Sequence, residues 1–192
     1  EAIALLFQDL HFIVCHLTKE DFRDEVMPVI VWALQREEDV GMLTVVLSQL
    51  AAVAPVVDYV KLKNEVLPQM QVLALNAPTL GVRIKSLHAL SLFFHLFDRV
   101  TIVDDLIPFL RDCIEIEKSP GMMMAVLGVF SAISKKLKAR VTAEHILPFI
   151  APLAYTPKLD TVQLNMFIRV GRQMVDKIAD ERGDEVQKET QA

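Results

Sequence analysis

The sequence predicts an all-α solenoid, a stack of two-helix repeats with a period of 40 residues, and we expect its superhelix to be right-handed. Prolines recur at this spacing, and each one ends a similar tetrapeptide such as Glu25-Val26-Met27-Pro28. Glycines and three columns of apolar residues recur in phase with them. Columns that keep one period along the chain indicate repeated copies of one unit. The prolines are Pro28, Pro68, Pro108 and Pro148, and the glycines are Gly41, Gly81 and Gly121.

The first helix of each repeat is predicted from apolar residues at helical spacing. In the second repeat Leu43, Val46, Leu47 and Leu50 follow the i, i+3, i+4, i+7 pattern, which places them on one face of a helix. The three apolar columns repeat this face, and they are Phe7/Leu47/Leu87/Leu127, Leu10/Leu50/Leu90/Phe130 and Ile13/Val53/Phe93/Ile133. We expect these helices at residues 2–16, 42–54, 82–97, 122–137 and 162–180.

The second helix of each repeat carries the proline. Proline is harmless in the first turn of a helix and bends the helix if it lies later, so each second helix should begin or bend at the same point. Thr18-x-x-Asp21 and Thr101-x-x-Asp104 have the pattern of helix N-caps. The recurring glycines suit a left-handed residue in the turn that leads back to the next first helix.

The repeat predicts the organisation of the chain. Paired antiparallel helices of this period are typical of the HEAT and armadillo class, in its two-helix HEAT-like form. A polar sequence follows Ala179 and fits a linker after a capping helix. We therefore expect a solenoid over residues 1–180, with units at 1–40, 41–80, 81–120 and 121–160, a capping helix at 161–180, and a polar tail at 181–192.

Composition excludes several classes of function. The net charge of −5 argues against a general nucleic-acid binder, because phosphate contacts need a basic surface. Cys15 and Cys113 have no metal-binding spacing, and we interpret both as reduced core residues of a cytosolic protein. No signal peptide or membrane span is predicted, and the abrupt apolar start suggests a piece of a longer protein whose first residues pack on upstream structure.

No catalytic motif is found in the sequence. The five histidines lack zinc-site spacing, and glycine-rich phosphate loops, nucleophile elbows and kinase signatures are missing. We therefore expect no enzyme activity, no metal and no cofactor in this chain.

One basic segment is the candidate contact site for a partner or an anionic surface. It comprises Lys135, Lys136, Lys138 and Arg140, in the turn between the two helices of the fourth unit. Such turns line an edge of a solenoid, where they could meet acidic lipid headgroups or an acidic protein. The alternative is a solvated turn that complements the negative end of the preceding helix, and it is the favoured reading. Met122, Met123 and Met124 could form an adaptable binding face, but filling of core gaps is favoured.

The second half of the chain resembles the HEAT-like region of the Scy-like pseudokinases, and most of all the branch associated with clathrin-coated vesicles. The resemblance covers about residues 80–180 and depends on the order of its segments. These segments are Val82-Arg83, Ser86-Leu87, 104–110, 127–130, 135–137, 147–153, Gln163 and Phe167-Ile168.

The resemblance implies a cytoplasmic interaction scaffold that follows a kinase-like domain and precedes a disordered tail. ATP would be bound only if that upstream domain binds it. Members of that branch bind clathrin and its adaptors, and act peripherally on Golgi, endosomes and coated vesicles. Clathrin-binding peptides are expected mainly in the tail. Two alternatives stay open: a regulatory HEAT arm of an active kinase, and an unrelated HEAT adaptor of nuclear transport or translation.

Overall fold

The computed structural model describes residue 7 and residues 9–191, and the regular structure of this part of the chain is helical throughout. The chain divides into two compact units, Glu1–Phe97 and Asp98–Ala192. Within the described residues, no helix combines the length and apolar character needed to cross a membrane.

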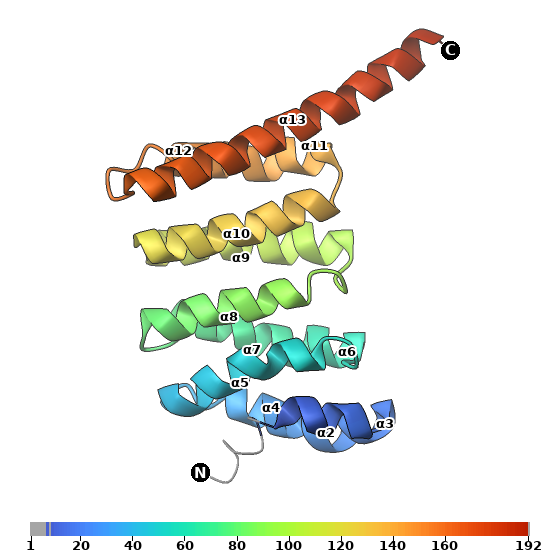
Figure 1. Cartoon of the computed structure of the whole chain (residues 1–192), viewed down its shortest axis with the longest axis vertical. Helices are drawn as coiled ribbons and strands as arrows, with labels where there is room; N and C mark the ends of the chain where they lie inside the picture. Colours follow the sequence, from blue (N-terminus) through green and yellow to red (C-terminus); the bar gives the residue numbers. More distant parts are fainter. Residues whose placement is uncertain (1–6, 8, 192) are drawn as a thin grey trace. The chain divides into compact units, whose positions relative to one another are not determined.

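The first unit holds the helices of the first two repeats and the first helix of the third (Figure 1). Helix α5 packs against α2, α4 and α8, and α7 packs against α4 and α8. Each second helix is one continuous rod with a π-helical middle, as in α3–η1–α4. The elements are α2 (Leu10–His16), α3 (Lys19–Asp21), η1 (Phe22–Val26), α4 (Met27–Leu34), α5 (Val40–Val53), α6 (Tyr59–Lys61), η2 (Leu62–Val66), α7 (Leu67–Asn76) and α8 (Leu80–Leu92).

The second unit holds the remaining helices (Figure 1). Helix α10 contacts α9 and α13, and α13 also contacts α11, η4 and α12. The elements are η3 (Thr101–Leu106), α9 (Ile107–Ile116), α10 (Pro120–Lys136), α11 (Ala139–Val141), η4 (Thr142–Ile146), α12 (Leu147–Leu153) and α13 (Thr161–Gln191).

The predicted apolar columns form the cores of both units. All twelve members of the three first-helix columns are buried except Ile13, which is half-buried. Met122 and Met123 are buried as well, which confirms that they fill the core, whereas Met124 is half-buried. Cys113 is buried, but Cys15 is exposed on α2, so its assignment to the core was wrong. Cys15 lies in an apolar stretch of sequence, but only Leu10 and Val14 of that helix are buried.

Each recurring proline is the second residue of an α-helix that continues directly from a π-helical segment. Before Pro28, the Met27 N–H donates to the carbonyl of Phe22, five residues back. A proline ring inside a regular α-helix clashes with the carbonyl four residues earlier and removes a hydrogen bond. The π-helical segment before each proline widens the helix at this point, and the helix continues through the proline without a break. All four prolines point to solvent.

The recurring glycines do not form left-handed turns, and this prediction was wrong. Gly41, Gly81 and Gly121 are the second residues of α5, α8 and α10, and no glycine among the described residues has a positive φ. The turns are instead ended by helix caps, because the side chains of Asp39, Thr79 and Ser119 accept the amides of Met42, Val82 and Met122. These caps also lie 40 residues apart.

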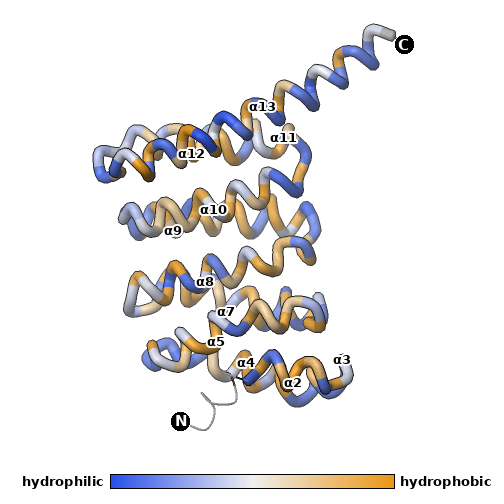
Figure 2. Tube along the Cα trace, in the orientation of Figure 1, coloured by the Kyte–Doolittle hydropathy of each residue, from blue (hydrophilic) through white to orange (hydrophobic). Residues whose placement is uncertain are grey.

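Two further boundaries differ from the prediction. Helix α8 ends at Leu92, because Phe93, Phe94 and Phe97 stay buried in the following turns without helical backbone. Helix α13 continues through the polar segment to Gln191, well beyond the expected end at 180. Hydrophilic residues dominate this part of α13, interrupted by isolated hydrophobic positions (Figure 2). The apolar start at residues 2–6 lies outside the described residues.

Candidate functional site

The four basic residues lie where α10 ends and α11 begins. Lys135 and Lys136 form the last turn of α10, Lys138 precedes α11, and Arg140 is its middle residue. All four side chains are exposed. Leu137, between them, is buried and ends α10, so it fixes the turn to the core while the lysines on either side face solvent.

Neighbouring carboxylates offset part of this positive charge. Arg140 Nε donates to Glu144 Oε1 at 2.7 Å. This hydrogen bond raises the pKa of Arg140 and lowers the pKa of Glu144. Partial burial lowers the pKa of Lys136, and the nearby Asp98 opposes this shift. Among the described residues Lys135 and Lys138 form no ion pair, so they are the two cations of this turn most open to a partner.

The last helix holds the turn from one side. Lys177 of α13 donates from Nζ to the carbonyl of Ser134 at 2.6 Å and to the carbonyl of Leu137. Glu181, one helical turn further, accepts the amide of Ala139 at 2.7 Å. The two side chains also approach each other, with 3.5 Å between Lys177 Nζ and Glu181 Oε1. Lys177 and Glu181 thus provide hydrogen-bond partners for backbone groups at the end of α10 and at the start of α11.

Lys138 occupies a position that is an N-cap in the other repeats. Thr18 and Asp58 accept amides at the starts of α3 and α6, and Asp98 accepts the amide of Thr101. Thr18 is the cap that its sequence pattern predicts. The predicted cap at Thr101 was wrong, because Thr101 is buried inside the helix that Asp98 caps. A lysine has no acceptor, so the fourth repeat lacks a local cap, and Glu181 supplies the missing carboxylate.

Lys177 binds the C-terminal end of α10, whereas Glu181 binds the N-terminal end of α11. The last four carbonyls of an α-helix have no partner within the helix and carry a partial negative charge. Lys177 donates to two carbonyls at the end of α10, where Lys135 and Lys136 add further positive charge. Beneath the turn, the buried Thr142 hydroxyl donates to the Ser134 hydroxyl at 3.1 Å. The turn is therefore a rigid base for its exposed lysines.

The contacts of Lys177 and Glu181 were not predicted from the sequence. The clue was the column Thr18, Asp58, Asp98 and Lys138, which recurs every 40 residues and changes chemistry only at its last member. That change indicates that the fourth helix start needs an acceptor from elsewhere. The sequence does not say where the acceptor comes from.

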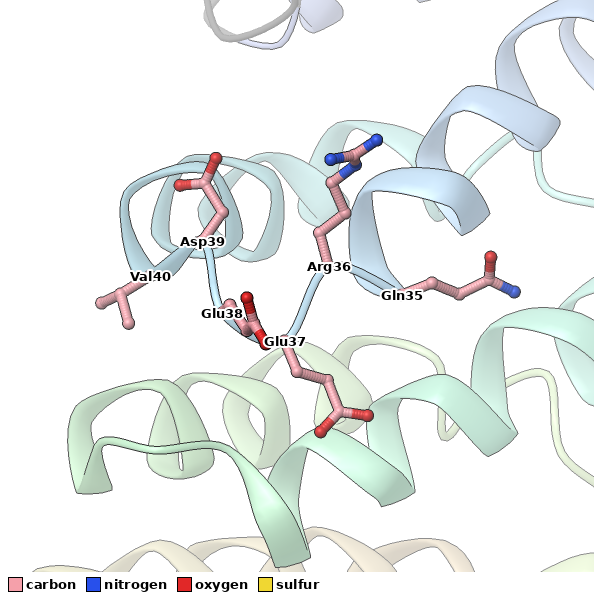
Figure 3. Close-up of a pocket in the computed structure, with 6 residues that line it drawn as sticks. All are labelled: Gln35, Arg36, Glu37, Glu38, Asp39 and Val40. Atoms are coloured by element: carbon pink, nitrogen blue, oxygen red, sulfur yellow. The ribbon is translucent and has the colours of Figure 1, made fainter.

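Two hollows on the surface of the described residues are lined mainly by polar groups. An open hollow of about 700 Å³ lies at the turn between α4 and α5, lined by residues 35–40. Figure 3 shows its side chains directed away from one another rather than toward a common point. Arg36 stacks on Trp32, with its guanidinium carbon 4.1 Å from the ring centre, and Asp39 caps α5. These polar groups serve the local structure.

A second hollow, of about 290 Å³, lies between the starts of the second helices of the first two repeats. It is lined by Lys19, Glu20, Arg23, Val56, Val57, Asp58 and Tyr59. Arg23 is paired with Asp24 at 2.7 Å, and Asp58 caps α6. In the part of the chain that the structure describes, no three His, Cys, Asp or Glu side chains gather to hold a metal ion.

Comparison with known proteins finds similar sequences, among them two mammalian proteins. The chain is 24% identical over 185 residues to SCY1-like protein 2 of Homo sapiens and to SCY1-like protein 2 of Mus musculus. Each alignment covers 94% of this chain and 20% of the relative, so the chain spans about a fifth of the length of these proteins. No family model and no solved structure matches. This distant similarity along most of the chain supports the resemblance to the Scy-like family.

Proposed function

We propose that this chain is a non-catalytic protein-interaction scaffold of a Scy-like protein. In this proposal the two units are parts of one right-handed HEAT-like solenoid with a 40-residue period. Similarity to SCY1-like protein 2 over 94% of the chain supports the family, and the helix caps, π-segments and prolines that recur at matching positions support the repeat. A stack of helix pairs offers long exposed edges and suits the binding of other proteins.

The basic turn of the fourth repeat is the contact site in this proposal. Lys135 and Lys138 are exposed, form no ion pair among the described residues, and stand on a turn that α13 fixes. A rigid base reduces the entropy that a partner must overcome on binding. The partner is an acidic protein surface, and in the setting of the family it belongs to the clathrin and adaptor machinery at the cytoplasmic face of Golgi, endosomes or coated vesicles.

The observation that carries this assignment is the pair of exposed lysines on the fixed turn. The test is a pull-down of clathrin and its adaptors from cytosol by the chain and by the variant Lys135→Glu/Lys138→Glu. Exposed charge contacts contribute to the rate and strength of association, so the variant should retain about a tenth of the wild-type binding or less. Binding should also fall as salt rises.

A matched control separates a specific contact from a general effect of charge. Lys19→Glu/Lys85→Glu makes the same change in net charge at two exposed lysines of the first unit and should bind normally. Circular dichroism checks that both double variants stay helical. Equal losses in the two variants would contradict a role for the basic turn. Capture of no protein by the wild-type chain would contradict the scaffold function itself.

Liposome flotation decides whether the same turn contacts a membrane. Vesicles of neutral lipid and vesicles with anionic lipid are compared at one salt concentration, because basic residues attract anionic headgroups only over about a Debye length. An acidic protein partner predicts no difference between the two vesicle types. Lysine-dependent flotation with anionic vesicles would replace the protein partner by a lipid surface.

A further inference from the structure

The outer side of α13 carries an apolar stripe that no described element covers. Its side chains remain exposed by 36% at Leu164, 40% at Ile168, 49% at Val175 and 44% at Val186. The spacings of four, seven and eleven residues return to one side of an α-helix. Four apolar side chains in one line along an exposed helix are unusual for a surface that faces only water.

The stripe is distinct from the face that holds α13 to the second unit. That face is formed by the buried residues Phe167, Val170 and Met174. Since each residue advances about 100° around a helix, the stripe lies about a third of a turn away from it. Another helix can therefore pack along the stripe without displacing the contacts with α10 and α12.

Charged residues beside the stripe indicate what covers it. Arg172 and Asp176 border it on the side away from the core, and both are exposed. They are four residues apart, yet no ion pair joins them in the described chain. We propose that α13 pairs with α13 of a second copy of this chain, antiparallel, about a two-fold axis at Val175.

The two-fold axis brings complementary residues together. An isologous contact places residue i against j and j against i. With Val175 opposite itself, Leu164 lies opposite Val186, and Ile168 lies opposite the aliphatic part of Arg182. Each Arg172 then lies beside the partner's Asp176, which gives two identical ion pairs.

The distribution of charge along α13 also favours the antiparallel direction. Before Val175 the charged residues of the helix are Arg169 and Arg172, whereas after it acidic residues outnumber basic ones. An antiparallel partner places the basic half of one helix against the acidic half of the other. One helix pair is smaller than a standard interface, so we expect a dimer with a Kd on the order of tens of micromolar.

Sedimentation equilibrium over about 5–300 µM tests the proposal and should show a monomer–dimer equilibrium. Val175→Glu should raise the Kd at least tenfold, because it places two like charges at the axis. Val162→Glu is the matched control: it lies on the same helix and is 75% exposed, but it is off the stripe and should leave the Kd unchanged. A chain that stays monomeric throughout, or association that survives Val175→Glu, would overturn the proposal.

A charge exchange tests the direction and the register. Arg172→Asp alone and Asp176→Arg alone should each raise the Kd about threefold to tenfold by placing like charges together. The double variant Arg172→Asp/Asp176→Arg should return the Kd to near the wild-type value, since the pairs re-form with their signs exchanged. A double variant that is no better than the single ones would reject the antiparallel arrangement, and with it the proposal.

Cross-linking locates the axis independently. In a Cys15→Ser background, Val175→Cys should form an intermolecular disulfide, because a residue on a two-fold axis meets its own copy. Val162→Cys should remain reduced under the same mild oxidation. Equal cross-linking of the two variants would show collision rather than a defined contact and would count against the axis.

Discussion

The second helices of the second and fourth repeats begin in different ways. In the second repeat Asp58 accepts the amides of Val60 and Lys61, two and three residues further along the chain. In the fourth repeat the corresponding residue is Lys138, and the acceptor is Glu181, 42 residues after the amide that it binds. The first arrangement is local and independent of packing. The second makes a helix start depend on where another helix lies, so it couples a cap to tertiary structure.

The strongest test of this difference removes the contacts of both Lys177 and Glu181. Lys177→Met/Glu181→Gln should lower the free energy of unfolding by about 2–3 kcal/mol, because it removes the two hydrogen bonds that Lys177 donates at the end of α10 and weakens the cap of α11. Urea denaturation followed by circular dichroism measures the change. The matched control is Asp184→Asn/Lys188→Met in the exposed end of the same helix, and it should stay within about 0.5 kcal/mol of wild type.

Restoring a local cap should make the fourth repeat behave like the second. Glu181→Ala should cost about 1–1.5 kcal/mol of stability. Adding Lys138→Asp should recover about 1 kcal/mol in that background, because aspartate is a strong N-cap. In the wild-type background the same substitution places a carboxylate beside Glu181 and should give little gain. Equal effects of Lys138→Asp in the two backgrounds would mean that Glu181 does not act as the cap.

Substitution of Asp58 measures how much stability a local cap contributes. Asp58→Ala should cost about 1 kcal/mol, and Asp58→Asn, which retains an acceptor, should cost only a few tenths. Amide hydrogen exchange should speed up at Val60 and Lys61. The exchange rates of amides in the second unit should not change, since this cap involves no residue beyond its own helix start. Faster exchange throughout the molecule would show that Asp58 has a wider role.

The smallest expected effect concerns the exposed pair beside the fourth cap. The hydrogen bond from Arg140 lowers the pKa of Glu144 below the ordinary value of 4.5. A lowered pKa means that the pair stabilises the folded chain above the unfolded glutamate's pKa, and that this contribution disappears as the pH falls through the folded value. An NMR titration should show a midpoint below 4.5 that moves upward in Arg140→Met. An unchanged midpoint would show that the pair is not formed in solution.

The helical structure could be predicted from the sequence because its signals are periodic. Burial of the apolar columns and the placement of Pro28, Pro68, Pro108 and Pro148 at equivalent points of the rods follow from residue type and spacing. The prediction of left-handed turns at Gly41, Gly81 and Gly121 was wrong for a definite reason. Glycine is tolerated in the first turn of a helix, so its recurrence alone did not distinguish a helix start from a helix end, whereas the caps two residues earlier did.

The site was only partly predictable. The exposure of Lys135 and Lys138 follows from the position of the turn, and the pair of Arg140 with Glu144 follows from its i, i+4 spacing. The placement of Asp98 near Lys136 depends on tertiary structure. The contacts of Lys177 and Glu181 join residues about 40 positions apart. Periodicity describes what each repeat shares, so it could not predict a contact that occurs once and replaces a missing member of a column.

The distance in sequence between Glu181 and the helix start that it caps also sets an order of events during synthesis. Thr18, Asp58 and Asp98 leave the ribosome together with the amides that they cap, so those helix starts can be completed as soon as they emerge. The start of α11 must wait until about 40 more residues have been translated. The start of α11 is therefore the last of these four helix starts to be completed during synthesis.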